Sequence, residues 1–210
     1  MWIFGYGSLL WYTDFEYQEV RGGHVGGYVR RFWQLSPDHR GTPEAPGRTV
    51  TLVASPKGAC WGLAYKVPEE HEKATIAYLD HREKAGYTCE KKLFAPDDGS
   101  PPFNVHVYIS ASEDNEFHAG PSEDEEIART ILIRHGPSGP NMEYALKLAL
   151  VLRSHSPHSD DDHVYSIERR ILELAQTTGQ AKDSLEKLGY RLVDGKWTPP
   201  EANEYSLLKR

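Results

Sequence analysis

A glycine-rich segment near the start of the chain is the first group of residues that could do chemistry. Gly5-Tyr6-Gly7-Ser8 directly follows the apolar run Trp2-Ile3-Phe4, so we expect a strand that leads into a tight turn. Leu10 stands where a dinucleotide fingerprint (G-x-G-x-x-G) and a nucleophile elbow (G-x-S-x-G) both need glycine, which argues against nucleotide binding and against a serine hydrolase. Successive backbone N–H groups in such a turn can bind an anion or a developing oxyanion. A tight turn that binds no ligand explains the same residues equally well.

Glu83 is the second candidate, as a general acid or base. It falls in the last turn of a helix that we expect Pro68 to begin and Gly86 to end. A carboxylate there faces the negative end of the helix dipole, and burial in that position would make it a stronger base. Residue types alone favour a different interpretation, a surface glutamate paired with Arg82, Lys84 or Arg129.

The remaining titratable residues give weaker signals for metal or thiol chemistry. One local cluster consists of His155, His158, His163 and the run Asp160 to Asp162. Its spacing matches neither H-E-x-x-H nor a zinc finger, so we expect a solvated loop before a helix and no metal site. Cys60 and Cys89 are too few for a disulfide framework, and neither lies beside a clear base in the sequence.

The elements that must position these residues come in the order strands first and helices later. Strands are expected at 2–4, 24–36, 49–54, 59–67, 87–95 and 103–111, with the turn 55–58 joining the third and fourth as a hairpin. Helices are expected at 68–86, 122–136, 140–154 and 160–176, and an Asp-Gly turn indicates a small hairpin at 190–197. Ser122 and Glu125 have the spacing of a capping box, and the Pro- and Gly-rich segment 38–48 is either a functional or a mobile loop. One helix between strands, followed by several helices, predicts an α+β fold.

Composition narrows the class of protein further. The chain has 210 residues, 24 Lys and Arg against 31 Asp and Glu, and a net charge of -7. This acidic balance argues against a general nucleic-acid binder, which needs a basic surface. The mean hydropathy is -0.61 and no apolar run approaches the roughly 18 residues of a membrane span, so we expect no membrane segment. The first residues do not resemble a signal peptide, and the expected location is the cytoplasm.

Five motifs in the same order resemble the ChaC-type glutathione-specific γ-glutamylcyclotransferases. The motifs are Trp2 to Trp11, Arg30 to Gln34, Asp38 to Leu52 without Glu44 and Ala45, Tyr78 to Tyr87, and Gly136 to Tyr144. The resemblance runs from residue 2 to about residue 175. We therefore predict one γ-glutamylcyclotransferase-like catalytic domain at 1–178 and a C-terminal extension of unknown role at 179–210.

This resemblance implies both a fold and a reaction. It implies a small β-barrel flanked by helices, and cleavage of glutathione to 5-oxoproline and cysteinylglycine without a cofactor. It also implies that Glu83 is the catalytic acid and base, and that Tyr6, Gly7, Ser8 and Leu9 bind the γ-glutamyl group. Tyr144 is a candidate for binding polar groups of the substrate. Arg40 or Arg48 is a candidate for its glycine carboxylate, on charge alone.

Two alternatives of different kinds stay open at this point. One is a cyclotransferase for other γ-glutamyl amino acids or amines, with the same first pocket and a different distal pocket. The other is a non-catalytic protein that binds a γ-glutamyl ligand or a protein partner. The presence of Glu83 argues against the second alternative, since a degenerate enzyme usually loses its acid/base residue first. The oligomeric state is not predicted.

Overall fold

The computed structural model describes residues 1–82, 86–110, 115–156 and 161–201. The chain divides into two compact units. The first unit comprises residues 1–30 and 51–118, and the second comprises residues 31–50 and 119–210. Each unit has its own buried apolar core.

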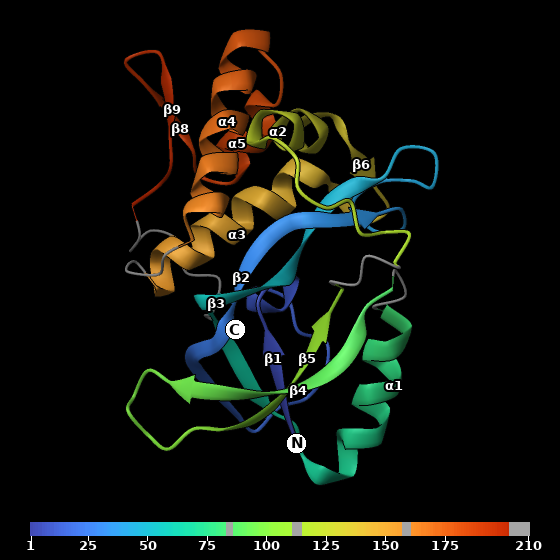
Figure 1. The fold of residues 1–210 in the computed structure, drawn as a ribbon. Helices are drawn as coiled ribbons and strands as arrows, with labels where there is room; N and C mark the ends of the chain where they lie inside the picture. Colours follow the sequence, from blue (N-terminus) through green and yellow to red (C-terminus); the bar gives the residue numbers. More distant parts are fainter. Residues whose placement is uncertain (83–85, 111–114, 157–160, 202–210) are drawn as a thin grey trace. The chain divides into compact units, whose positions relative to one another are not determined.

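Five strands of the described chain close into a barrel in the order β1-β3-β2-β4-β5. They are β1 (Trp2–Gly5), β2 (Glu19–Ser36), β3 (Gly47–Lys66), β4 (Thr88–Pro96) and β5 (Phe103–Ile109) (Figure 1). Strand β1 runs antiparallel to β3, with Gly5 opposite Leu63, and parallel to β5, with Ile3 opposite His106. Together with the helices, this closed barrel confirms the predicted α+β class and the predicted small β-barrel.

The predicted hairpin around residues 55–58 is wrong, because β3 continues straight through this segment. Gly58 does not serve a turn. A Cβ atom at that position would lie 2.7 Å from the carbonyl oxygen of Tyr28 and 2.7 Å from the Val29 side chain, so glycine allows β2 and β3 to approach closely. Pro56 is exposed, which is where a strand tolerates a residue without an N–H donor.

Apolar side chains from every strand fill the core of the first unit. Those that are almost completely buried include Ile3, Phe4, Val25, Leu52, Phe94, Val105 and Val107. The rings of Phe4 and Phe94 lie with their centroids 5.6 Å apart. Each fully buried side chain of this size contributes roughly 1.5–3 kcal/mol through removal from water, which makes this core the main source of barrel stability.

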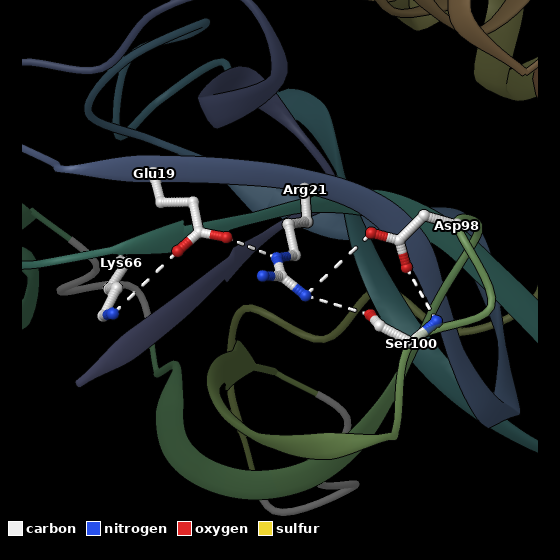
Figure 2. A network of polar contacts seen from close by, with 5 residues as sticks. All are labelled: Glu19, Arg21, Lys66, Asp98 and Ser100. Atoms are coloured by element: carbon white, nitrogen blue, oxygen red, sulfur yellow. Dashed lines mark hydrogen bonds and ion pairs between the residues drawn. The ribbon is translucent and has the colours of Figure 1, made fainter.

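Arg21 on β2 connects several elements on the surface of the first unit (Figure 2). Its guanidinium donates hydrogen bonds to Glu19 (2.5 Å) and to the Ser100 hydroxyl (2.9 Å), which follows β4. The guanidinium carbon also lies 5.8 Å from the ring centre of Trp2 on β1 and 5.9 Å from that of Phe103 on β5. Because these side chains are partly exposed, the network adds modestly to stability and mainly sets the orientation of the strand ends.

The first unit also contains the helix that carries the sequence up to Glu83. A 3₁₀ turn, η2 (Glu69–His71), precedes the helix α1 (Glu72–Arg82). Pro68 and the acidic first turn favour a start at this point, as expected. Thr75 and Leu79, four residues apart, are the buried face of α1.

The second unit is mainly helical. Its elements are α2 (Asp124–Ile133), β6 (His135–Gly136), β7 (Gly139–Pro140), α3 (Asn141–His155), α4 (Asp162–Thr178), α5 (Lys182–Lys187), β8 (Arg191–Val193) and β9 (Lys196–Thr198). Helix α3 is buried on most sides, whereas α4 buries one stripe, formed by Val164, Ile167, Ile171 and Ala175. The predicted helices at 140–154 and 160–176 and the Asp-Gly hairpin are confirmed. The sequence pattern did not indicate α5 or the short β6–β7 pair.

The predicted capping box at α2 is wrong. Helix α2 begins at Asp124, and the residue at its N-cap is Glu123, which makes no side-chain capping hydrogen bond. The hydroxyl of Ser122 instead accepts a hydrogen bond from the Arg48 guanidinium at 3.4 Å. A tertiary partner has therefore replaced the local one that the sequence spacing suggested.

The described residues 179–201 pack into the second unit through a buried carboxylate. Glu168 on α4 accepts two hydrogen bonds from Arg153 on α3, at 3.1 and 2.6 Å, and one from the Tyr190 hydroxyl at 2.6 Å. Tyr190 and Leu185 are almost completely buried. The predicted boundary between a catalytic domain at 1–178 and an extension at 179–210 stays a prediction.

None of the described helices has both the length and the apolar character that a membrane span requires.

His163 links α4 to β2 within the second unit. Its Nε2 atom accepts a hydrogen bond from the backbone N–H of Phe32 at 3.1 Å, so the ring must be neutral with the proton on Nδ1, which lies 3.4 Å from Asp124. Burial, and next the nearby Arg31, lower the pKa of His163 to about 4, while Asp124 and Asp161 act in the opposite direction.

Lowering the pH should destabilise the protein through His163. The pKa is below its value of about 6.5 in the unfolded chain, so the unfolded state binds more protons between these values. The stabilisation is therefore complete above pH 6.5 and is lost as the pH falls toward 4. Between pH 7 and pH 4.5, the unfolding free energy of the wild type should fall by roughly 1–3 kcal/mol more than that of His163→Gln, measured by urea denaturation. His71→Gln, at a half-exposed histidine, is the control, and an equal pH dependence in both variants would contradict this account.

Candidate functional site

The glycine-rich segment forms a tight turn at the end of β1. Gly5 ends the strand, and the 3₁₀ helix η1 (Ser8–Leu10) follows at once. A Cβ atom at Gly5 would lie 2.6 Å from the Cβ of Leu9 and 3.4 Å from the Tyr65 ring. Glycine is therefore needed here because the turn folds back directly onto the end of the strand.

Two buried tyrosine hydroxyls hold this turn in place. Tyr6 donates a hydrogen bond to the carbonyl of Tyr108 on β5 at 2.5 Å, and Tyr65 on β3 donates one to the carbonyl of Leu9 at 2.6 Å. Burial raises the pKa of Tyr65, so its hydroxyl keeps the proton that it donates. The turn is thus attached to both strands that flank β1.

The first N–H groups of the turn precede its internal hydrogen bonds along the chain. The first bond within the turn runs from the N–H of Leu10 to the carbonyl of Gly7, at 3.0 Å. The N–H groups of Ser8 and Leu9 precede it and are the ones that a short helix leaves for an outside acceptor. Tyr6, Gly7, Ser8 and Leu9 therefore belong to one restrained turn, and their binding of a γ-glutamyl group stays a prediction.

The last turn of α1 contacts the same loop. Arg82 donates a hydrogen bond to the Ser8 hydroxyl at 2.5 Å, and Asp80 accepts one from the Tyr108 hydroxyl at 2.7 Å. Burial and this hydrogen bond to Asp80 raise the pKa of Tyr108. Glu83, the predicted acid and base, is the next residue in the sequence after Arg82 and lies outside the described residues.

Two other predicted residues lie together in the second unit. Arg40 is buried, donates a hydrogen bond to the carbonyl of Pro140 at 3.1 Å, and has its guanidinium carbon 5.8 Å from the ring centre of Tyr144. Burial lowers the pKa of Arg40, whereas Glu143 raises it. The Tyr144 hydroxyl accepts a hydrogen bond from the N–H of Val50 at 3.3 Å. The Arg40 side chain is therefore held by the Pro140 carbonyl and the Tyr144 ring, and the Tyr144 side chain by the Val50 N–H and the Arg40 guanidinium.

Arg48, the alternative to Arg40, is committed to structural contacts. Its guanidinium donates hydrogen bonds to the Phe32 carbonyl and to the Ser122 hydroxyl, both at 3.4 Å. Its backbone is held on both sides by Asn141, which accepts from the Arg48 N–H at 2.6 Å and donates to the Arg48 carbonyl at 2.8 Å. These contacts favour Arg40 over Arg48 as the residue that can bind an anionic group.

Sequence reasoning missed several residues that position the candidate site. Asn141 lies within the last motif, but its role depends on a strand that is distant in the sequence. Asp14 and Arg82 form part of the contact between α1 and the loop. The spacing of Tyr78 and Arg82, four residues apart on one helix, was an available signal that they face the same neighbour.

The histidine cluster does not assemble a metal site among the described residues. His163 bonds to the backbone of Phe32, and His155 contacts the Val151 carbonyl on its own helix. His158 lies outside the described part of the chain. No group of three or more His, Cys, Asp or Glu residues within the described ranges has an arrangement that could hold a metal ion.

Comparisons with known proteins give consistent results. The model of the ChaC-like protein family matches residues 1–174. Glutathione-specific γ-glutamylcyclotransferase 1 of Danio rerio is 42% identical over 175 residues, which cover 82% of this chain and 89% of the relative. A glutathione-specific γ-glutamylcyclotransferase of Schizosaccharomyces pombe is 36% identical over 195 residues, covering 85% and 95%. A crystal structure of a γ-glutamyl cyclotransferase specific to glutathione from yeast superposes with a TM-score of 0.76 at 28% identity, covering 82% of this chain and 96% of that one.

Gly5→Ala should destabilise the protein and distort the turn. The added Cβ would overlap the Cβ of Leu9, which is attached directly to the backbone and cannot rotate away. We expect a loss of about 1–3 kcal/mol in unfolding free energy, measured by urea denaturation. Gly26→Ala is the matched control, because a Cβ at Gly26 on β2 would meet nothing within 4 Å. Equal stability of the two variants would show that the close approach at Gly5 is not a constraint.

Proposed function

Since the chain belongs to the ChaC-like protein family, we propose that it is a glutathione-specific γ-glutamylcyclotransferase, which converts glutathione into 5-oxoproline and cysteinylglycine. The observation that carries this proposal is the family match over residues 1–174, which includes every residue that we assign to the site. The names and the coverage of the relatives from Danio rerio and Schizosaccharomyces pombe support the same substrate. The reaction needs no external nucleophile, in keeping with the lack of a nucleophile elbow.

The chemistry is an intramolecular substitution. The α-amine of the γ-glutamyl group attacks its own side-chain carbonyl carbon, forms the C–N bond of a five-membered lactam, and releases the nitrogen of cysteinylglycine as the leaving amine. Two protons leave the attacking ammonium group, and two reach the leaving nitrogen, which becomes an ammonium group, so charge and protons balance. Holding the substrate in the conformation that cyclises supplies much of the rate enhancement.

Glu83 is the residue that we assign to proton transfer. An α-amine has a pKa of about 8, so at neutral pH it is mostly protonated and cannot attack until a base removes a proton. A carboxylate can take that proton and then deliver it to the leaving nitrogen. The hydrogen bond from Arg82 to Ser8 supports this assignment, because Arg82 is covalently joined to Glu83 and contacts the proposed substrate loop.

The turn after β1 is assigned to the γ-glutamyl group. The attack places negative charge on the carbonyl oxygen, which needs hydrogen-bond donors in fixed positions. The backbone N–H groups of Gly7, Ser8 and Leu9 are suited to this, because hydrogen bonds from Tyr6 and Tyr65 restrain the turn that carries them. A donor fixed before the reaction starts costs no reorganisation when charge develops.

Arg40 and Tyr144 are assigned to the remainder of glutathione. The glycine carboxylate is an anion that a guanidinium can bind with two parallel hydrogen bonds. Tyr144 lies against the Arg40 guanidinium and can contact polar groups of the substrate itself.

We place the protein in the cytoplasm and assign it no cofactor and no nucleic-acid partner, on the grounds of composition and of this reaction.

Glu83→Gln should abolish turnover of glutathione while leaving binding and folding intact. The amide has nearly the same shape as the carboxylate but cannot accept the proton from the α-amine. We expect release of 5-oxoproline to fall at least about 1,000-fold, with a Tm close to that of the wild type. The measurement is 5-oxoproline formation from glutathione, followed by chromatography. Glu70→Gln, at an exposed glutamate in η2, is the matched control and should keep full activity.

The outcome of this assay also separates the alternatives. Retained activity in Glu83→Gln would overturn the assignment of the acid and base. Turnover of γ-glutamyl-alanine without turnover of glutathione would keep the mechanism and change the substrate. Absence of 5-oxoproline from both substrates with the wild-type protein would refute the proposed function and favour a binding protein.

A further inference from the structure

Arg82 lies at the junction of two segments that are distant in the sequence. It is the last described residue of α1, and its guanidinium donates a hydrogen bond to the Ser8 hydroxyl at 2.5 Å. The same guanidinium lies 3.7 Å from the carboxylate of Asp14 and 5.9 Å from the ring centre of Tyr12. One side chain therefore contacts the first residue of the 3₁₀ turn Ser8–Leu10 and two residues of the segment that follows it.

Asp14 is itself held from the helix. The hydroxyl of Tyr78 donates a hydrogen bond to the second carboxylate oxygen of Asp14. Burial, and next this hydrogen bond, raise the pKa of Tyr78, so the phenol remains the donor. Tyr78 and Arg82 are four residues apart and therefore lie on the same side of α1. Two consecutive turns of α1 therefore bind this segment, one through Tyr78 at Asp14 and the next through Arg82 at Ser8.

A separate connection attaches α1 to the strand beside the loop. Asp80 accepts a hydrogen bond from the Tyr108 hydroxyl, and the carbonyl of Tyr108 accepts one from Tyr6. This connection does not pass through Arg82. Removal of the Arg82 side chain should therefore loosen the Ser8 part of the loop while α1 stays attached to β5.

We propose that Arg82 is a positioning residue for the cyclotransferase reaction, which orients the Ser8–Leu9 backbone by its hydrogen bond to Ser8 and is itself aligned by Asp14. The proposal rests on the proposed function. It assigns to Ser8 a role that differs from nucleophilic catalysis: its hydroxyl accepts a hydrogen bond that sets the direction of the adjacent N–H groups. Displacements of about 1 Å in such donors change rates by about 100-fold.

The length of this ion pair distinguishes positioning from bulk stability. The nearest charged atoms of Arg82 and Asp14 lie 3.7 Å apart, beyond hydrogen-bond distance, so the pair adds little to stability. The main core of the first unit lies elsewhere, in the barrel. Loss of the Arg82 side chain should therefore affect turnover much more than it affects the Tm.

The test is a double-mutant cycle between Arg82 and Ser8 in the full chain. We expect Arg82→Gln and Ser8→Ala each to lower kcat by about 10-fold, with KM for glutathione changed by less than about 3-fold and the Tm within about 3 °C of the wild type. If Arg82 acts through Ser8, the double variant should lose about 10- to 20-fold, well short of the roughly 100-fold of independent effects. Asp14→Asn should show a smaller loss in kcat of the same kind.

Arg129→Gln is the matched control for removal of a guanidinium. Arg129 is paired with Glu125 on the exposed side of α2, so its loss should leave kcat unchanged. Three results would each overturn the proposal: unchanged kcat in Arg82→Gln, multiplicative losses in the double variant, or a loss of kcat that is matched by a large fall in Tm. If Arg82→Gln does not fold, the cycle with Asp14→Asn and Ser8→Ala decides, and multiplicative losses there overturn the proposal.

Failure of this proposal is distinguishable from failure of the proposed function. If the wild-type protein releases no 5-oxoproline, the proposed function is wrong, and the role of Arg82 falls with it. If the wild type is active and Glu83→Gln is inactive while Arg82→Gln retains full kcat, the proposed function stands and only the positioning role of Arg82 is wrong.

Discussion

The close return of the chain onto the end of β1 is the constraint on which the candidate site depends. Strand β1 is short and lies between β3 and β5, and at Gly5 the backbone turns so sharply that a single methyl group would collide with Leu9. The hydroxyls of Tyr6 and Tyr65 then attach the turn to the neighbouring strands. Both of these strands belong to the closed barrel, so the position of the turn is set by the barrel itself.

Helix α1 contributes polar contacts to the same loop. Its apolar contribution is limited to one face, and its final turns use Tyr78, Asp80 and Arg82 to bind the loop and β5. Individually such partly exposed contacts add little to stability. Their geometric effect is larger, because they restrict the orientation of groups that must fit a transition state within a fraction of an ångström.

In the second unit, one buried amide and one buried carboxylate each join segments that are distant in the sequence. Asn141 satisfies both backbone groups of Arg48, and Glu168 satisfies Arg153 and Tyr190 together. A buried polar group that lost these partners would be destabilising, so each fixes the segments that it joins. Asn141 thereby joins α3 to Arg48 on β3, and Glu168 joins α4 to α3 and to Tyr190.

The amino-acid sequence by itself determined the family, the fold class, most helices and the tight turn that follows Gly5. These features depend on motifs and on local periodicity. It indicated a hairpin at 55–58 and a capping box at Ser122, and both were wrong. Gly58 allows the close approach of the Tyr28 backbone, and Ser122 accepts a hydrogen bond from Arg48. Both partners are remote in the sequence. Only the tertiary structure decided that Arg82 holds Ser8 and that Arg48 is occupied by structural contacts, since spacing along a chain does not specify which distant side chains meet once the strands have closed into a barrel.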